Sequence, residues 1–259
     1  MCGFDTPNSW VILSPIEQSI KNKIESVGKP LREWDINIYR GVLTGYNDAF
    51  IIDSAKRDEI LANCKTEDER QRTTELIRPI LRGRDIKRFG YDWAGLWLIN
   101  THNGVKGKYP PIDINDYPAV KQHLDFYWDK LKNRDDKGIT PYNLRNCAYL
   151  DDFNKPKLFY ADITQNLNFV LCDEVMFCNN TTYFMVANED TILPAVQVYL
   201  NSKLIDWYYR TLSVQLGEKA VRMFSIYVLN IPIPKSLLEN VYEAYHLTNE
   251  EINYIENRE

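Results

Sequence analysis

The sequence predicts an α+β fold in which mostly antiparallel sheets pack against helices. Segments rich in β-branched and aromatic residues cluster along the 259-residue chain and do not alternate regularly with helices. The strict strand–helix–strand order of a doubly wound, nucleotide-binding sheet is therefore missing. Glycine is scarce, at 11 residues, which also argues against a protein built around glycine-rich nucleotide loops.

Capping boxes, each a Ser or Thr with Glu three residues later, mark the expected helix starts. They are Ser14 with Glu17, Thr66 with Glu69, Ser236 with Glu239, and Thr248 with Glu251. The first opens an amphipathic N-terminal helix, with Pro15 in its first turn and an apolar stripe of Ile16, Ile20, Ile24 and Val27. We expect this stripe to pack on the body of the chain.

Strands are predicted at 36–43, 49–53, 96–101, 157–163, 168–178, 181–187 and 224–231. Two further helices are predicted from apolar stripes, one with Val120, Leu124, Tyr127 and Leu131, the other with Val196, Tyr199, Leu200, Leu204, Trp207 and Tyr208. The run from Ile231 to Pro234 has proline at alternate positions and indicates an edge strand or an exit from a sheet. A C-terminal helical tail follows it.

These elements suggest a linking helix at 1–30, a main domain at 31–235 and an acidic helical tail at 236–259. The net charge is −5, and residues 239–259 alone carry six Glu and one Arg, so the remainder of the chain is balanced. Charged patches must therefore be judged locally. Five irregularly spaced cysteines suit a reducing compartment, and no apolar run is long enough to span a membrane, so a soluble, intracellular protein is expected.

Catalytic signatures are mostly absent. Tyr109-Pro110-Pro111-Ile112 lacks the polar first residue and the aromatic last residue of an adenine methyltransferase loop. The three histidines and the cysteines have no zinc-ligand spacing. The sequence thus predicts no catalytic residue, no metal site and no cofactor in this chain. Two alternatives remain: a metal-dependent nuclease using Asp113, Asp135 and Lys137, and a protein-interaction scaffold using the acidic tail and the aromatic surface.

Three segments have the composition of a nucleic-acid-binding face. The first, Arg78–Arg88, carries five basic residues against one acidic residue, and arginine offers a rigid fork of donors to phosphate or guanine. A solvated charged turn is the alternative reading. The second is a glycine-punctuated turn that displays Thr44, Tyr46 and Asn47, which can contact base edges or simply close the turn. The third is a loop after a predicted strand that carries His102, Lys106 and Lys108.

Several strings in order carry a resemblance to one family. They are Gly41–Asp53 (GVLTGYNDAFIID), Arg78–Phe89 (RPILRGRDIKRF), Trp97–His102 (WLINTH), Asp116–Leu124 (DYPAVKQHL), Leu131–Gly138 (LKNRDDKG), Tyr142–Arg145 (YNLR), Lys155–Lys157 (KPK), Tyr199–Leu204 (YLNSKL) and Asn230–Pro234 (NIPIP). From about residue 14 to 235 the chain resembles the TaqI-like C-terminal specificity domain. This is the target recognition domain of type IIG restriction–modification enzymes and related adenine-specific DNA methyltransferases.

The resemblance implies sequence-specific binding of double-stranded DNA and a division of labour. A methyltransferase domain N-terminal to this chain in the parent would methylate an adenine swung out of the duplex, using S-adenosylmethionine, and type IIG members add a nuclease domain. It also implies a cytoplasmic protein of a bacterium or archaeon. DNA contacts are expected from Arg82, Arg84, Lys87 and Arg88, mainly to phosphates, and from Thr44, Tyr46, Asn47, His102, Lys106 and Lys108. The loops 102–115 and 164–182, which match the family least, are the expected readers of base sequence.

Overall fold

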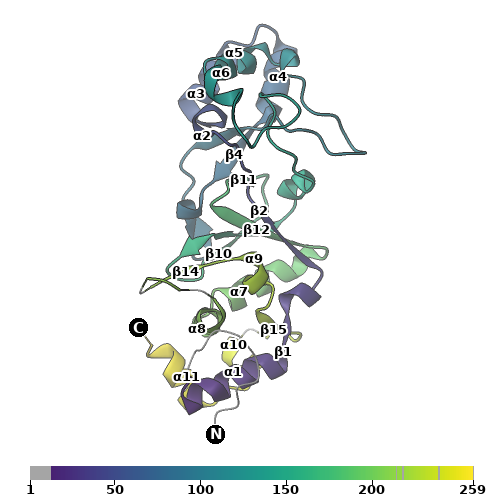
Figure 1. Ribbon diagram of the computed structural model, residues 1–259. Helices are drawn as coiled ribbons and strands as arrows, with labels where there is room; N and C mark the ends of the chain where they lie inside the picture. The colour runs from purple at the N-terminus through teal and green to yellow at the C-terminus, as the bar shows by residue number, and fades with distance from the viewer. Residues whose placement is uncertain (1–12, 214, 218, 239, 259) are drawn as a thin grey trace.

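A four-stranded antiparallel sheet forms the waist of the protein in a computed structural model that describes residues 13–213, 215–217, 219–238 and 240–258. Its strand order is β10 (Phe169–Cys172), β8 (Lys157–Ala161), β12 (Thr182–Ala187) and β2 (Ile36–Arg40). A second sheet with five helices lies above this waist and further helices lie below it, so the molecule is elongated (Figure 1). The α+β class with mostly antiparallel sheets is confirmed.

Both faces of the central sheet are buried. In β8, Leu158 and Tyr160 point into the lower core, whereas Phe159 points into the upper core. In β12, Met185 and Phe184 divide in the same way, because successive side chains of a strand point to opposite faces. The sheet therefore joins two hydrophobic cores.

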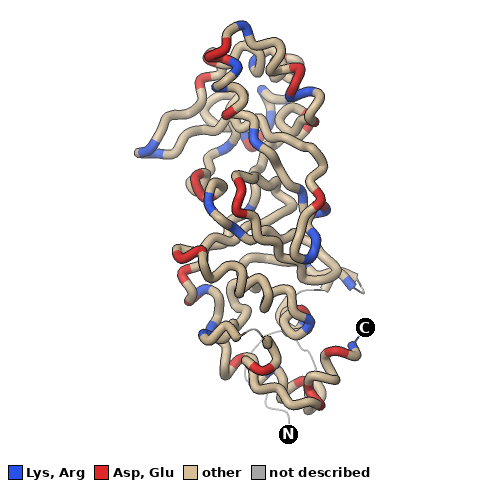
Figure 2. The backbone as a smooth tube through the Cα atoms, turned by 180° about the vertical axis from the view of Figure 1, so that it is seen from behind, with Lys and Arg blue, Asp and Glu red and all other residues tan. Residues whose placement is uncertain are grey.

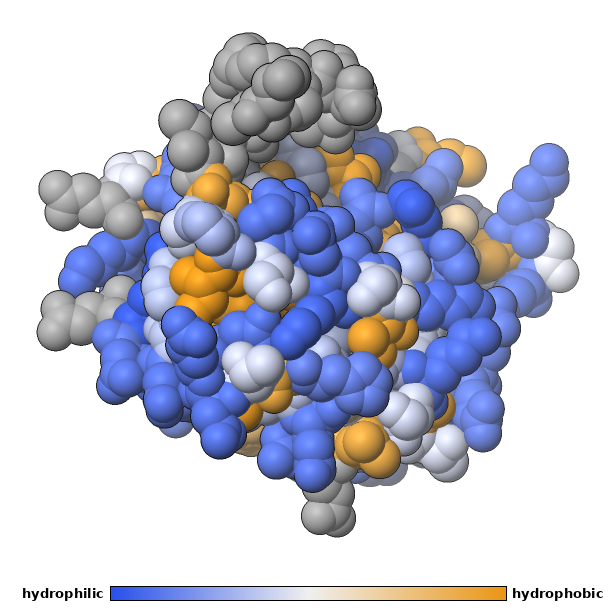
Figure 3. All heavy atoms as spheres, turned by 90° about the horizontal axis from the view of Figure 1, so that it is seen from below, coloured by the Kyte–Doolittle hydropathy of each residue, from blue (hydrophilic) through white to orange (hydrophobic). Residues whose placement is uncertain are grey.

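The lower half consists of helices packed beneath the central sheet. They are α1 (Pro15–Val27), α7 (Leu193–Leu200), α8 (Lys203–Leu212), α9 (Ser225–Val228), α10 (Val241–Ala244) and α11 (Asn249–Glu256). Ile20 and Ile24 of α1 are fully buried in the lower core, so the apolar stripe packs on the chain's own body as predicted. Hydrophilic residues dominate the described surface seen from below, with apolar residues scattered among them (Figure 3).

A short ladder joins the segment after α1 to a segment near the C-terminal helices. Strand β1 (Gly28–Pro30) pairs antiparallel with β15 (Pro232–Pro234) as an isolated two-stranded sheet. The proline-rich run is thus an edge strand, as its sequence indicates. The capping boxes at Ser14 and Thr248 are both formed. The one predicted at Ser236 lies partly outside the described residues.

The upper half is built on a second sheet in the order β11 (Phe177–Cys178), β4 (Ile77–Leu81), β7 (Leu96–Ile99) and β3 (Ile51–Asp53). Only the β11–β4 pairing is parallel among the described ladders. Five short helices surround this sheet: α2 (Asn47–Phe50), α3 (Ser54–Ala62), α4 (Glu67–Leu76), α5 (Pro118–Asp125) and α6 (Trp128–Leu131).

Small ladders and 3-10 turns complete the described chain. The ladders are β5 (Ile86–Lys87) with β6 (Gly90–Tyr91), and β9 (Ile163–Thr164) with β14 (Ala220–Arg222) and β13 (Gln215–Leu216). The turns are η1 (Leu31–Glu33), η2 (Gly83–Asp85), η3 (Ile114–Asp116), η4 (Leu150–Asn154) and η5 (Asp190–Ile192). Among all the residues that the structure describes, no helix is long and apolar enough to cross a membrane.

Several boundaries differ from the sequence prediction. The strand predicted at 224–231 is wrong, because these residues form helix α9 and a turn; a short apolar run does not distinguish the two structures. The long helix predicted around 196–208 is two helices. Ser202 caps the second one, accepting the Ile205 N–H at 3.2 Å, and the Asn201 amide binds the backbone of Phe169.

The other predicted long helix and one capping box also differ. Helices α5 and α6 are separated by a turn at Phe126 and Tyr127. At the start of α4, the Thr66 hydroxyl accepts the Glu69 N–H at 3.1 Å, which is one half of a capping box. The Glu69 carboxylate does not return a bond to the Thr66 N–H but accepts the N–H groups of Lys65 and Ala119. This half-formed box instead joins α4 to α5.

Candidate nucleic-acid interface

The arginine-rich string crosses the upper face of the central sheet towards its β10 edge: η2 contacts β8, and β5 and β6 contact β10. Arg82 and Asp85 form a two-pronged ion pair there, with Nε and Nη2 of Arg82 at 3.0 and 2.8 Å from the carboxylate oxygens. Burial opposes ionisation of Asp85, but the side-chain and backbone hydrogen bonds from Arg82 outweigh it and lower the pKa of the carboxyl. The Arg82 guanidinium is therefore already engaged within the protein.

Arg88 is also held by the chain. Its Nη2 donates to the carbonyl of Asn201 at 2.8 Å, at the C-terminal end of α7, where a cation complements the helix dipole. The Arg84 side chain is exposed and makes no hydrogen bond or ion pair within the described residues. Lys87 is also exposed; its Nζ donates to the Arg84 carbonyl at 3.2 Å and lies 3.9 Å from Asp92. Arg84, Lys87 and Arg88 are all exposed, but of the three only Arg88 is anchored to a distant segment, so Arg84 and Lys87 are the outward-facing cations of the string.

The turn at residues 44–47 is closed by its own hydrogen bonds. Thr44 is buried and its hydroxyl donates to Oδ1 of Asn47 at 2.6 Å. Tyr46 packs on Tyr127, with ring centroids 5.9 Å apart. Of the two readings that the sequence allows for this turn, these contacts fit local closure.

Arg134 connects several loops of the upper half. It is 6% exposed and its guanidinium donates to the carbonyls of Thr44, Pro141 and Asn143 while lying 4.4 Å from the Phe50 ring centroid. Burial lowers the pKa of Arg134 to about 10, so the group remains charged at neutral pH. Arg134 lies in one of the family strings, Leu131–Gly138, but is not among the DNA-contact residues predicted from the sequence.

Residues 102–112 form a braced hairpin, closed by a bridge between Val105 and Tyr109. At its base, Nδ1 of His102 accepts the Gly104 N–H at 3.1 Å, and burial lowers the pKa of His102. Lys108 and the Tyr109 hydroxyl both bind Asp151, at 2.6 and 2.9 Å. These contacts make His102 and Lys108 parts of the hairpin's support.

The tip of the 102–112 hairpin is free. Gly107 takes a φ of +81° there, a conformation that glycine adopts without strain. Lys106 is exposed and has no hydrogen-bond or ion-pair partner in the part of the chain that the structure describes. The hairpin protrudes from the body and carries basic residues at its tip (Figure 2).

The hairpin and the arginine-rich string lie toward opposite edges of the central sheet. Asp151, which holds the hairpin, follows Tyr149, and the Tyr149 ring stacks on Tyr39 of β2 at 4.3 Å. The Tyr149 hydroxyl donates to the Arg40 carbonyl at 3.0 Å. Because β2 and β10 are the two edge strands, the predicted residues do not form one cluster.

Two of the three residues of the nuclease alternative, Asp113 and Lys137, have side chains that bind other partners. Asp113 accepts the backbone and side-chain N–H groups of Asn115 at 3.0 and 2.9 Å. Lys137 donates to the Lys132 carbonyl at 2.9 Å. Among the described residues, no group of three or more His, Cys, Asp or Glu side chains is arranged to hold a metal ion.

Comparisons with known proteins point in one direction. The sequence profile of the TaqI-like C-terminal specificity domain matches residues 78–233. The type II methyltransferase M.PaeR7I of Pseudomonas aeruginosa is 23% identical over 231 residues, which are 87% of this chain and 37% of that enzyme.

Two solved structures have a similar fold. The type IIG restriction endonuclease BpuSI matches with a TM-score of 0.56 at 14% identity, over 94% of this chain and 28% of that one. The type IIL restriction–modification enzyme MmeI, solved in complex with DNA, matches with a TM-score of 0.54 at 15% identity, over 75% of this chain and 24% of that one. The chain thus matches only 37% or less of the length of each of these proteins.

Proposed function

The chain belongs to the family of TaqI-like C-terminal specificity domains. We propose that it is the target recognition part of a restriction–modification enzyme and that it binds a specific sequence in double-stranded DNA. The match over residues 78–233 carries this conclusion. The relatives support it, since one is a type II methyltransferase and another was solved with DNA.

The chemistry is proposed to lie outside this chain. The parent would carry an adenine-specific methyltransferase domain that binds S-adenosylmethionine, and any nuclease activity of the parent would lie in a further domain. This chain would carry no catalytic group. Its part would be to place the target adenine, which must leave the base stack before an enzyme can modify it.

The proposed DNA contacts are the outward cations. Arg84 and Lys87 would bind phosphates at the β10 edge, and Lys106 would approach the groove at the tip of the 102–112 hairpin. Arg82, His102 and Lys108 would act indirectly, because their side chains hold the string and the hairpin in shape. Arg88 would do so through Nη2, which donates to the Asn201 carbonyl, while its other guanidinium donors stay available. Thr44, Tyr46 and Asn47 would support the loops in the same way.

Fluorescence-anisotropy titration tests this assignment. A binding sequence would first be selected from a pool of duplexes with a random centre. Replacing Lys106 or Arg84 with Ala should weaken binding and make the slope of log K against log salt shallower by about one for each lost phosphate contact.

Lys130→Ala is the matched control, because Lys130 is an exposed lysine on α6 and belongs neither to the arginine-rich string nor to the hairpin. It should leave affinity and slope unchanged. Equal effects of all three substitutions would mean that only net charge matters and would contradict the proposed contacts. Failure to select any sequence, with the chain folded, would contradict the proposed function itself.

A further inference from the structure

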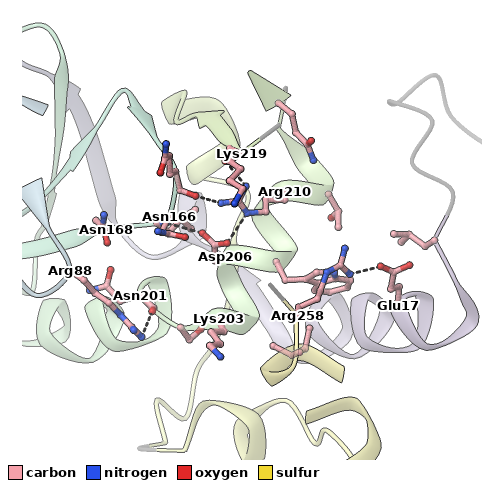
Figure 4. A pocket seen from close by; sticks show the side chains of 18 residues that line it. Glu17, Arg88, Asn166, Asn168, Asn201, Lys203, Asp206, Arg210, Lys219 and Arg258 are labelled. Atoms are coloured by element: carbon pink, nitrogen blue, oxygen red, sulfur yellow. Dashed lines mark hydrogen bonds and ion pairs between the residues drawn. The ribbon is translucent and has the colours of Figure 1, made fainter. Parts of the chain in front are cut away.

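A groove lined by both charged and apolar side chains opens in the lower half of the molecule, with a volume of about 850 Å³. Loop 165–168 forms one wall, helix α8 forms the floor, and the ends of α1 and α11 close the other side (Figure 4). Arg88, at the end of the arginine-rich string, lies at its rim, so the groove continues the β10 edge. We call it the lower groove.

Positive charge exceeds negative charge in the lower groove. Its lining includes five basic side chains, namely Arg88, Lys203, Arg210, Lys219 and Arg258, and two acidic ones, Glu17 and Asp206. Both carboxylates are neutralised within the groove, Glu17 by Arg258 at 2.6 Å and Asp206 by Arg210 at 2.7 Å. Lys203 pairs with Glu256 at 2.8 Å. Arg88 and Lys219 therefore carry the surplus positive charge.

Arg210 makes the groove rigid. Besides its ion pair with Asp206, it donates to the carbonyl of Lys219 at 2.9 Å and to the carbonyl of Gln165. Asp206 in turn accepts the Leu167 N–H at 2.8 Å. The loop and the segment that carries Lys219 are thus both fixed to α8. A site held in this way loses little conformational entropy when a ligand binds.

Two asparagine side chains without hydrogen-bond partners among the described residues also line the lower groove. They belong to Asn166 and Asn168, and Figure 4 shows both on the loop wall. Asn201 differs, because its amide binds both the N–H and the carbonyl of Phe169, at 2.7 and 2.8 Å. Free amides beside free cations suit phosphate and sugar oxygens.

We propose that the lower groove binds the phosphodiester backbone of DNA that flanks the recognised sequence. The inference rests on the proposed function and adds a second contact area to it. Lys219 and the outer donors of Arg88 would bind phosphate oxygens, and Asn166 and Asn168 would bind phosphate or sugar oxygens. The groove would thus extend the footprint of the chain on the duplex without reading bases.

The test compares two duplexes that share the selected sequence, one of about 12 and one of about 30 base pairs. Since a helical turn is about 10 base pairs, the longer duplex adds almost two turns of flanking DNA. The wild-type chain should bind the longer duplex more tightly and with a steeper salt slope. The double variant Lys219→Ala with Asn166→Ala should lose this advantage, with a salt slope about one unit shallower, and bind the short duplex as the wild type does. Lys130→Ala is again the charge-matched control.

The outcomes separate the two proposals. Retained preference for the longer duplex in the double variant would overturn the groove assignment and leave the proposed function standing. Equal loss on both duplexes would overturn it too, because the groove would then contact the target itself. A wild-type chain that binds neither duplex would overturn both proposals.

Side-chain amide resonances of Asn166 and Asn168 give an independent readout. Addition of the longer duplex to ¹⁵N-labelled protein should shift them, and the short duplex should not. Inorganic phosphate alone serves as the competing ligand. If millimolar phosphate shifts them as strongly as the longer duplex does, the groove is a small-anion site and the DNA assignment is wrong.

Discussion

Two arginines organise the two halves of this molecule in different ways. Arg134 holds the upper loops through carbonyl groups alone and is almost completely buried. Arg210 holds the walls of the lower groove, but its side chain is 24% exposed and its charge is matched by Asp206. Removing a buried charge leaves its partners unsatisfied in the protein interior, whereas a partly exposed ion pair is screened by water. The upper loops should therefore lose more stability than the lower groove when the arginine of each is removed.

Replacing Arg134 with Met gives the largest expected effect. The carbonyls of Thr44, Pro141 and Asn143 would lose their donor, and the free energy of unfolding should fall by about 3–5 kcal/mol, because each buried acceptor left unsatisfied costs about 1–3 kcal/mol. Urea denaturation measures the loss. Hydrogen exchange should become faster in the 102–112 hairpin before the central sheet is affected. A loss below that of Arg210→Ala would contradict the comparison of the two halves.

Glu251 offers a second test, in the contact between α1 and α11. Burial opposes its ionisation, but hydrogen bonds from Lys23, the Thr248 N–H and Ser19 outweigh it and lower the pKa of Glu251 to about 2. A carboxyl whose pKa is lower in the folded state stabilises the protein above the unfolded pKa of about 4.3. That stability is lost as the pH falls from there towards 2.

Glu251→Gln should therefore cost about 2 kcal/mol at neutral pH, the usual value for hydrogen bonds to a charged group. The same variant should be less sensitive to acid than the wild type between about pH 4.3 and 2. Denaturation at a series of pH values checks both. Glu250→Gln, one position earlier and exposed, is the control and should change neither stability nor pH dependence. Identical pH profiles for Glu251→Gln and the wild type would show that Glu251 is not responsible.

The sequence predicts much of the framework. The central strands were found because runs such as 157–161 and 182–187 are rich in β-branched and aromatic residues. Two capping boxes were predicted at the correct residues because each is a local contact over three positions. The strand at 224–231 was mispredicted because short apolar runs fit a helix equally well.

The sequence predicts only in part which arginines are free to contact DNA and which are already bound within the protein. Asp85 stands three residues after Arg82, so their pairing is a local pattern that the sequence already contains. The carbonyl that holds Arg88 belongs to Asn201, 113 residues away, and Arg134 binds the Thr44 carbonyl across 90 residues. Such contacts depend on how the sheets bring distant segments together. The lower groove was missed for the same reason, because its walls come from separate parts of the chain.

Arg210→Ala should cost about 1 kcal/mol, less than Arg134→Met, because the exposed part of the ion pair is screened. The loss should come mainly from the two carbonyl contacts to Gln165 and Lys219. Urea denaturation in low and in high salt separates the ionic part from the rest. A strong dependence on salt would mean that the charge pair with Asp206 dominates, contrary to this expectation.

The smallest effect on stability is expected at Arg84, and it sharpens the comparison within a single string. Arg84→Ala should change the free energy of unfolding by no more than about 0.5 kcal/mol, as is usual for a surface side chain without partners. Arg82→Ala should cost about 2 kcal/mol, because the buried carboxylate of Asp85 would lose its charged partner and only the backbone N–H of residue 82 would remain to bind it.

The order of the two variants should reverse when their effect on DNA binding is measured. At a temperature where both variants are fully folded, Arg84→Ala should make the salt slope of DNA binding shallower by about one, and Arg82→Ala should leave the slope unchanged. Equal slopes for the two variants would mean that the outward arginine does not touch the duplex, and the DNA-binding role of this edge would have to be given up.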